Sequence, residues 1–279
     1  MVVAVTGASG QVGLALQEIQ NADIRWHFLG RQDADITNLT LLKRTFANIK
    51  PDVVVNLAAY TAVDRAESEP ESAYKINAEG AQNVAIACRE IDAILIHIST
   101  DFVFDGYGNS PYTENDVANP LNVYGKSKLA GEQNISAEYS KHIILRSSWI
   151  YSDFGKNFYK TMLQLAGQGK TLRIVNDQYG SPTQALDLAE AISTIVRAAE
   201  KTFGIYHFAN KGVTTWYEFA TEIFKMHDLN PELIPISSAA FGAPAERPGY
   251  SVLSTDKIKS DYGIVPADWL ESLHKRRRP

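Results

Sequence analysis

The chain has 279 residues, of which 45% are hydrophobic and 21% charged, and its formal net charge is −5. These values are ordinary for a globular protein; they argue against a disordered chain and, because there is no general basic field, against nucleic acid as a partner. Cys88 is the only cysteine, which excludes an intramolecular disulfide and a cysteine-rich metal site. No apolar run approaches the roughly 20 residues of a membrane span. The first residues lack a signal-peptide pattern, so we expect a cytoplasmic protein without a membrane partner.

Strand-like and helical patterns alternate through the first 150 residues. Short apolar runs predict strands at residues 2–5, 26–29, 52–57, 93–98 and 143–145. Apolar residues at helical spacing predict helices at residues 11–20, 39–49, 71–90 and 124–139. Strands that alternate with helices imply right-handed crossovers, and therefore a doubly wound parallel α/β sheet with helices on both faces.

This alternation ends near residue 150. Residues 157–167, 186–200 and 215–227 are predicted helices, separated by segments rich in Pro and Gly. We interpret residues 1–150 as one domain and residues 151–279 as mainly a smaller second domain, some of whose segments could return to the first domain. The basic end, residues 275–278, is interpreted as a solvated tail rather than a tether.

A glycine-rich segment at residues 7–13 follows the first predicted strand and opens the first predicted helix. Its glycines, Gly7, Gly10 and Gly13, have the spacing Gly-x-x-Gly-x-x-Gly that is associated with short-chain dehydrogenases. Glycines at such a turn let the backbone approach a pyrophosphate, and the helix N-terminus offers free N–H groups and a partial positive charge. The segment therefore predicts a dinucleotide site, which makes residues 1–150 the dinucleotide-binding domain and residues 151–279 mainly the substrate-binding domain.

The end of the second predicted strand bears on the choice of cofactor. It reads Leu-Gly-Arg-Gln, with Arg31 and with no acid before Asp33. An acid there would bind the ribose hydroxyls of NAD, whereas an arginine can accept the additional phosphate of NADP. The sequence thus favours NADPH and leaves NADH possible. Asp35 and Ile36 follow at a position suited to flank the adenine.

Three side chains form the candidate catalytic set. Tyr124 and Lys128 are four residues apart and share one face of a helix. A nearby ammonium is expected to lower the pKa of the tyrosine from its reference value of about 10. Thr100 directly follows the fourth strand, at the sheet edge where parallel sheets bind ligands. Its hydroxyl could hold a substrate carbonyl while Tyr124 donates a proton. The six histidines show no metal-ligand spacing.

Several longer motifs extend this set. They read TDFVF at 100–104, PLNVYG at 120–125, KLAGE at 128–132, RSSWIY at 146–151 and NDQYGSPT at 176–183. Together they resemble the dTDP-4-dehydrorhamnose reductase family of extended short-chain dehydrogenases, and the similarity covers essentially the whole chain. The resemblance implies a Rossmann-type sheet with a smaller C-terminal α/β domain. It also implies NADPH- or NADH-dependent reduction of a 4-keto sugar nucleotide, which yields dTDP-L-rhamnose for surface polysaccharide.

The resemblance assigns roles to residues that match the family motifs. Tyr124 would donate the proton, with Thr100 as its hydroxyl partner, and Lys128 would bind the nicotinamide ribose. The other expected cofactor contacts are Gln11, Val12, Asp35, Ile36, Ala59, Tyr60 and Thr61. The expected substrate contacts are Thr100, Asp101 and Trp149.

Three positions depart from relatives or exclude alternatives. Some family members are said to form a magnesium-bridged dimer through glutamates, but Ala15 and Leu186 stand at those positions, so these residues give no support to Mg²⁺ or to that dimer. A monomer or homodimer remains open.

Phe102 stands where a sugar-nucleotide dehydratase would have a glutamate base. Another epimerase or reductase of sugar nucleotides remains an alternative. So does a non-catalytic NADP-binding subunit resembling the regulatory subunit of methionine adenosyltransferase.

Overall fold

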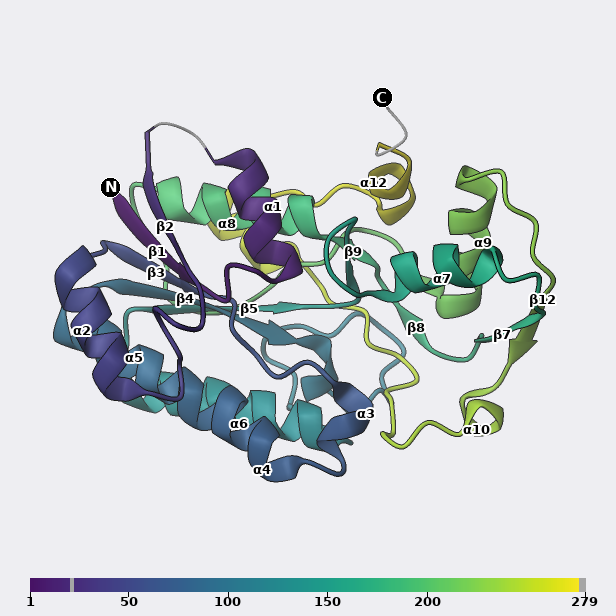
Figure 1. Cartoon of the computed structure of the whole chain (residues 1–279), viewed down its shortest axis with the longest axis horizontal. Helices are drawn as coiled ribbons and strands as arrows, with labels where there is room; N and C mark the ends of the chain where they lie inside the picture. Colours follow the sequence, from purple (N-terminus) through teal and green to yellow (C-terminus); the bar gives the residue numbers. More distant parts are fainter. Residues whose placement is uncertain (21–22, 276–279) are drawn as a thin grey trace.

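The computed structural model describes residues 1–20 and 23–275, and its centre is a six-stranded sheet (Figure 1). The strand order is β10-β5-β4-β3-β1-β2, and every neighbouring pair is parallel. The strands are β1 (Val2–Thr6), β2 (Arg25–Leu29), β3 (Val53–Asn56), β4 (Ile94–Thr100), β5 (His142–Ser147) and β10 (Gly204–His207). Five of them correspond to the predicted strands. β10 was not predicted, because it is short and lies beyond the alternating region.

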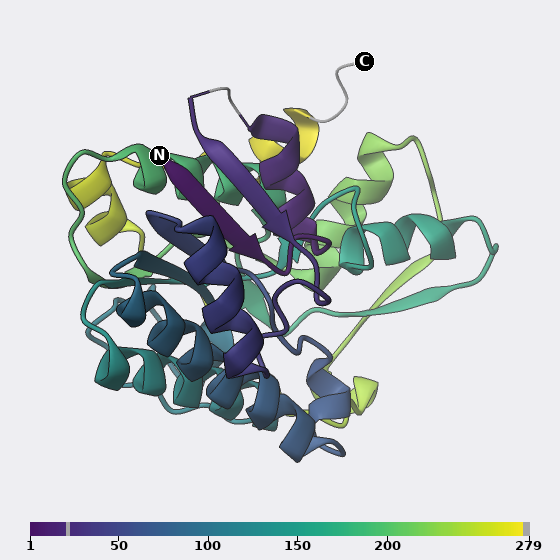
Figure 2. The ribbon, with the colours of Figure 1, turned by 60° about the vertical axis from the view of Figure 1, so that its left-hand side comes forward.

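Helices cover both faces of this sheet (Figures 1 and 2). One face packs against α1 (Gln11–Ile19) and α8 (Ala185–Arg197), and the other against α2 (Leu39–Ile49), α5 (Gly80–Glu90) and α6 (Val123–Glu138). Within β1, Val3 and Val5 are buried in the first cluster and Ala4 in the second, because successive strand side chains point to opposite faces. The predicted doubly wound parallel fold is confirmed.

The predicted helix at residues 71–90 is wrong as one continuous helix. It consists of α4 (Pro70–Tyr74), the π-helical turn η1 (Lys75–Glu79) and α5. Asn77 in η1 accepts a hydrogen bond from the backbone N–H of Tyr60 and donates to the Tyr60 carbonyl and to Ser127 Oγ. The wide turn therefore holds the loop after β3 against α6. Apolar periodicity continues through such a turn, so the sequence pattern did not indicate it.

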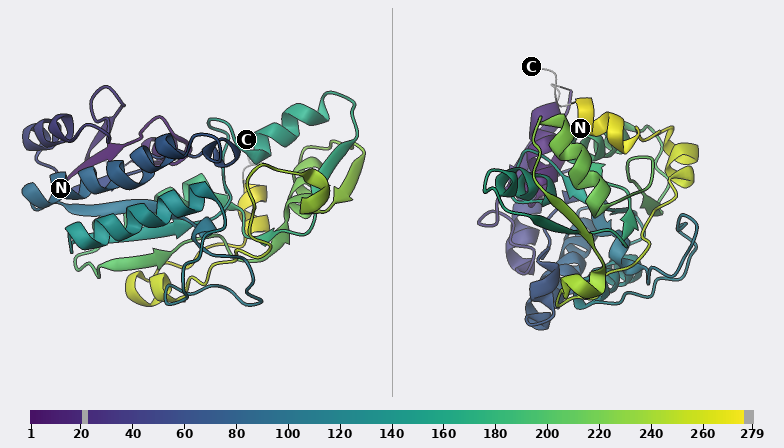
Figure 3. Two further views of the ribbon diagram at one scale, coloured as in Figure 1. Left: turned by 90° about the horizontal axis from the view of Figure 1, so that it is seen from below. Right: turned by 90° about the vertical axis from the view of Figure 1, so that its right-hand side faces the viewer.

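A smaller group of elements lies beyond one end of the sheet (Figure 3). Its core is formed by α7 (Phe158–Ala166), β7 (Leu172–Val175), α9 (Trp216–Met226) and β12 (Leu233–Ile236), and β12 pairs in parallel with β7. The remaining short elements are α3 (Val63–Ala66), η2 (Asp101–Val103), β6 (Ile150–Tyr151), β8 (Tyr179–Gly180), β9 (Thr183–Gln184), β11 (Thr214–Thr215), α10 (Ser238–Phe241), α11 (Asp256–Tyr262) and α12 (Trp269–Lys275). The tail at residues 276–278 is outside the described residues.

The connections place a ligand crevice at the carboxyl ends of the strands. The chain passes from β1 outward to β2, and then returns to add β3 on the opposite side of β1. In doubly wound sheets such a reversal opens a crevice at the strand ends, where nucleotides bind. Within residues 1–20 and 23–275, no helix is long and apolar enough to cross a bilayer.

Candidate active site

A cavity of about 810 Å³ lies at this crevice, between the strand ends and the smaller group of elements. Its walls contain every predicted site residue except Tyr60. These are Gly7, Gly10, Gln11, Val12, Gly13, Arg31, Asp35, Ile36, Ala59, Thr61, Thr100, Asp101, Tyr124, Lys128 and Trp149. Tyr60 is buried beside the cavity instead, and its hydroxyl donates to Glu69 Oε2 at 2.8 Å. The fold thus brings together residues that are up to 142 positions apart, from Gly7 to Trp149 (149 − 7).

The glycine loop leaves its backbone open toward the cavity. Gly7 has φ +67°, and a Cβ there would lie 2.5 Å from the backbone nitrogen of Ala58, so only glycine fits this turn. Gly10 caps α1 without any side-chain hydrogen bond, which leaves the first N–H groups of the helix available to an anion. Gln11 Oε1 accepts hydrogen bonds from Ser152 and Asn157, which ties the loop to the chain beyond β6.

Arg31 lies at the outer rim of the cavity, where its side chain is 79% exposed. Its Nε donates to Asp35 Oδ2 at 3.0 Å. Partial burial acts to raise the pKa of Asp35, but hydrogen bonds from Thr37 and from Arg31 outweigh burial and hold this pKa below its ordinary value. Asp35 therefore stays ionised and orients the guanidinium, although an exposed pair of this kind adds little stability.

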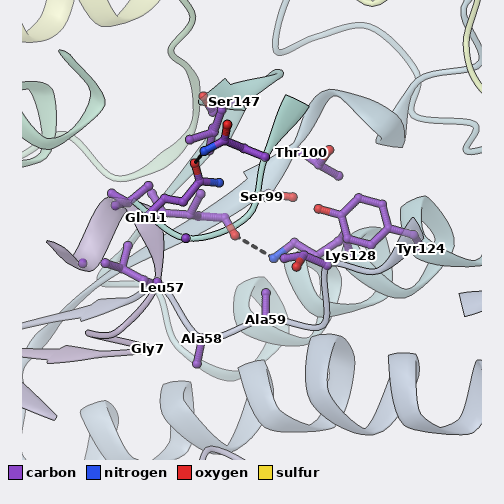
Figure 4. Close-up of a pocket in the computed structure, with 18 of the residues that line it drawn as sticks. Gly7, Gln11, Leu57, Ala58, Ala59, Ser99, Thr100, Tyr124, Lys128 and Ser147 are labelled. Atoms are coloured by element: carbon purple, nitrogen blue, oxygen red, sulfur yellow. Dashed lines mark hydrogen bonds between the residues drawn. The ribbon is translucent and has the colours of Figure 1, made fainter. Parts of the chain in front are cut away.

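Tyr124 reaches the cavity from the first turn of α6. Asn122 caps this helix by accepting from Gly125 N at 2.8 Å, and its amide donates to the Glu246 carbonyl. A Cβ on Gly125 would lie 2.2 Å from the carbonyl oxygen of Phe102, so the missing side chain lets α6 approach the end of β4. The Tyr124 hydroxyl consequently points toward the space between Ser99, Thr100 and Lys128 (Figure 4).

The expected lowering of the tyrosine pKa is wrong for this structure. Burial of the hydroxyl away from water raises the pKa of Tyr124 to about 12. The hydrogen bond with Thr100 acts to lower this pKa, and the nearby Asp101 carboxylate acts to raise it further. The hydrogen-bond partners of the Lys128 amine are backbone and histidine: Nζ donates to the Ile98 carbonyl at 2.6 Å and lies 3.3 Å from His97 Nε2. Tyr124 is therefore protonated at neutral pH, as a proton donor must be.

Two further ionisable groups near the tyrosine have strongly shifted pKa values. Burial lowers the pKa of Lys128 to about 8, against the opposing charge of Glu132. Burial raises the pKa of Asp101 to about 7, although hydrogen bonds from Ser251 and Thr100 oppose that shift. Perturbed groups gathered in one cavity are typical of an active site.

Trp149 and Trp216 form an aromatic wall. Their rings stack at 3.6 Å with an interplanar angle of 9°, and Trp149 has φ +47°, an uncommon backbone conformation for a bulky residue. The Trp216 indole N–H donates to Gln178 Oε1 at 3.0 Å. Trp216 also lines the cavity, and its position at the start of the helix predicted at residues 215–227 gave no signal of this.

Arg247 is a second cavity residue that sequence reasoning missed. It lines the cavity, and its Nη2 donates to Asp64 Oδ2 at 2.9 Å. Asp64 also accepts from the backbone N–H of Ala245. The two contacts join the 244–249 segment to α3. The place of Arg247 between Glu246 and Pro248, outside the motifs quoted above, gave no local signal of a site residue.

The positions proposed for metal bridging in relatives are apolar here and lie in a packed interface. Ala15 is completely buried and Leu186 partly buried, where α1 packs against α8. Within the described part of the chain, no three His, Cys, Asp or Glu side chains gather as a metal site would require.

Comparisons with known proteins agree with this geometry. The family model described as the RmlD substrate binding domain matches residues 1–277. A dTDP-4-dehydrorhamnose reductase from Sinorhizobium fredii is 40% identical, over 99% of this chain and 96% of that protein. The spore coat polysaccharide biosynthesis protein SpsK of Bacillus subtilis is 41% identical, over 98% and 95%. The crystal structure of dTDP-4-dehydrorhamnose reductase from Bacillus anthracis in complex with NADP has a TM-score of 0.94 at 38% identity, over 99% of this chain and 97% of that chain.

Proposed function

The chain belongs to the dTDP-4-dehydrorhamnose reductase family, and we propose that it uses NADPH to reduce the C4 keto group of dTDP-4-dehydro-L-rhamnose. The product would be dTDP-L-rhamnose, a precursor of surface polysaccharide. The observation that carries the proposal is that Thr100, Tyr124 and Lys128 line one cavity together with the glycine loop.

The residues around the cavity fit a dinucleotide. The glycine loop offers the uncapped N–H groups of α1 to a pyrophosphate. The hydroxyls of Ser99 and Ser147 are buried at the cavity wall and have no partner within the described residues, which supports a polar ligand there. Arg31 would meet the additional phosphate of NADP, and Lys128 the ribose next to the nicotinamide.

The chemistry divides between the cofactor and the protein. When bound, the reduced nicotinamide supplies the hydride. Thr100 orients the substrate carbonyl by a hydrogen bond. Tyr124 donates its phenolic proton to the carbonyl oxygen as negative charge develops there, and the Lys128 ammonium stabilises the phenolate that remains.

The residue after Asp101 supports reduction rather than elimination. Phe102 lies with its ring edge-on to Tyr124, at 6.0 Å between centroids, and lines the cavity. A phenyl ring cannot take a proton from the sugar, so a dehydratase would lack its base at this position. The intact Thr100/Tyr124/Lys128 set likewise supports an enzyme over a non-catalytic subunit.

The finer assignments are also part of this proposal. Residues 1–150 would hold the cofactor, and the sugar nucleotide would lie between Thr100, Asp101 and Trp149. The part after residue 150 would supply most of the remaining substrate contacts, although β10 and α8 lie with the large sheet. A cytoplasmic location follows from the need for the cell's pool of reduced dinucleotide.

A direct assay tests the proposed function. Purified protein mixed with NADPH and dTDP-4-dehydro-L-rhamnose should oxidise the cofactor, with loss of absorbance at the nicotinamide band and formation of dTDP-L-rhamnose. A parallel reaction with a UDP-4-keto sugar should be slower. If no NADPH is consumed with the dTDP substrate while NADPH still binds, the substrate assignment is wrong.

Arg31 should set the preference between the two cofactors. Arg31→Ala is expected to raise KM for NADPH by about tenfold, since it removes a charged partner of the phosphate, and to leave KM for NADH nearly unchanged. Steady-state kcat/KM for both cofactors measures this. Lys50→Ala, which removes a positive charge from outside the cavity, is the matched control. An unchanged NADPH/NADH ratio in Arg31→Ala would show that the side chain is only a solvated rim residue.

A further inference from the structure

A row of buried polar side chains crosses three strands behind the cavity. Thr6 of β1, Asn56 of β3 and His97 of β4 are direct cross-strand neighbours. Each is no more than 1% exposed, and all three are on the sheet face covered by α5 and α6. The row ends at Lys128, which enters the same layer from α6 and is 2% exposed.

Hydrogen bonds join these four side chains without interruption. Thr6 Oγ1 donates to Asn56 Oδ1 at 2.6 Å, and Asn56 Nδ2 lies 2.9 Å from His97 Nδ1. His97 Nε2 lies 3.3 Å from Lys128 Nζ. Lys128 has a role in the proposed reaction, but His97 and Asn56 have none. Burying polar groups costs free energy unless they are bonded, so the row is expected to serve the lysine at its end.

The partners of Asn56 determine which nitrogen of His97 carries a proton. The backbone N–H of Ala58 can only donate, and it lies 3.3 Å from Asn56 Oδ1. Asn56 Oδ1 therefore accepts from the Ala58 N–H and from the Thr6 hydroxyl. The Asn56 NH₂ group then faces His97 Nδ1, so Nδ1 must accept a hydrogen bond from it. Burial, then the charge of Lys128 and then His142 hold the pKa of His97 far below its ordinary value, so the ring is neutral. A neutral ring that accepts at Nδ1 carries its proton on Nε2, facing the lysine.

We propose that His97, oriented by Asn56, is a positioning residue that holds the Lys128 amine against the Ile98 carbonyl and disfavours its ammonium form by presenting a ring N–H to it. An ammonium has three N–H donors and no lone pair, whereas a neutral amine can accept from Nε2–H. The inference rests on the proposed function for its role in turnover, and the contacts themselves do not depend on it.

This arrangement makes Lys128 a ready proton source for Tyr124. After Tyr124 has given its proton to the substrate oxygen, the O–H bond of the phenol must be restored. The Lys128 ammonium supplies this proton through a hydroxyl or water between the two side chains, because the described hydrogen bonds of Nζ go to Ile98 and His97 and not to Tyr124, and it becomes an amine, which His97 stabilises. One proton from bulk solvent, the proton that the overall reduction consumes, then returns to the amine. A lysine with its ordinary pKa would release that proton far more reluctantly.

Other ionisable groups act on this site from the surrounding elements. Glu132, one turn along α6, favours the ammonium, but it is paired with Arg146 of β5 at 2.7 Å. His142 of β5 acts on His97, and Asp101 of η2 acts on Tyr124. None of them contacts Lys128 Nζ in place of His97 among the described hydrogen bonds.

The first experiment reads the tautomer directly. Long-range ¹H–¹⁵N correlation on the full-length protein, with His97 assigned by its absence in His97→Phe, should show a protonated Nε2 and an unprotonated Nδ1. A proton on Nδ1 would overturn the proposal, because Nε2 would then accept from an ammonium. This measurement needs no variant to remain active.

The second experiment reverses the tautomer. In Asn56→Asp the carboxylate should accept from Nδ1–H, so that Nε2 accepts from Lys128 and favours the ammonium. We expect the alkaline limb of the kcat–pH profile to move up by about one pH unit, a tenfold change in the acid dissociation constant of Lys128. In the His97→Phe background, the same Asn56→Asp change should move the alkaline limb by less than about a third of the shift seen with His97 present. An unmoved limb in Asn56→Asp, or an equal shift in both backgrounds, overturns the role of His97.

Two controls separate this inference from the proposed function. His142→Gln removes a buried histidine of the neighbouring strand that bonds to Tyr139 O, and it should leave the alkaline limb in place. The ¹³Cε resonance of Lys128, assigned with Lys128→Met, can be titrated without any substrate. If the sugar nucleotide proves not to be reduced, this titration should still move upward in Asn56→Asp. If it does not move, the inference fails whatever the substrate is.

Discussion

Tyr124→Phe is expected to lower kcat for the 4-keto sugar nucleotide by roughly 10²–10⁴-fold, the range lost with a positioned proton donor. The ring would remain packed edge-on against Phe102, so the phenolic O–H is the only group removed. Affinity for NADPH, measured by its fluorescence, should change by less than about twofold. The loss should therefore appear in kcat and kcat/KM together, as for an interaction made only in the transition state.

Tyr206→Phe is the matched control for this variant. Tyr206 lies on β10, where its hydroxyl donates to Asp261 Oδ2 at 2.8 Å, and it does not line the cavity. Its loss should cost about 1 kcal/mol of stability and leave kcat unchanged. Near-normal turnover in Tyr124→Phe would refute the assignment of Tyr124 as the proton donor.

Glu132→Ala is expected to lower the free energy of unfolding by about 3–5 kcal/mol, because it leaves a buried guanidinium without its partner. Arg146 and Glu132 join β5 to α6, with Nη2 and Oε2 2.7 Å apart and side chains only 4% and 2% exposed. Arg146 Nε makes two further bonds to the same carboxylate, and its guanidinium lies 5.1 Å from the Phe104 ring centroid. Urea denaturation measures the loss.

An exposed ion pair between two helices of the same layer is the control. Lys43 and Glu90 join α2 to α5, with side chains 38% and 44% exposed. Lys43→Ala should cost less than about 1 kcal/mol, since solvent already screens this pair. Equal losses in Glu132→Ala and Lys43→Ala would mean that the buried pair is not a special determinant of stability.

Much of the fold follows from the sequence because its signals are local. The glycines at residues 7–13 stand between a β-branched run and an amphipathic helix, and the fold has β1 and α1 there. The ends of the 39–49 helix were predicted without error, since Asn38 caps it through Leu41 N and apolar spacing continues to Ile49. The π-helical turn and β10 were missed, because hydrogen bonds to the backbone of Tyr60, 17 positions away, and a distant strand decide them.

The sequence by itself determined which chemical groups the protein carries: the Tyr124/Lys128 spacing on one helix, the hydroxyl of Thr100 after a strand, and the apolar Ala15 and Phe102. Only the tertiary structure decided the environment of those groups. Burial raises the pKa of Tyr124 where the lysine was expected to lower it, and Lys128 meets His97 and Ile98 instead. Trp216 and Arg247 join the cavity from segments whose local pattern is that of ordinary packing or loop residues. Desolvation and cross-strand contacts depend on residues brought together by folding, so no local pattern could have shown them.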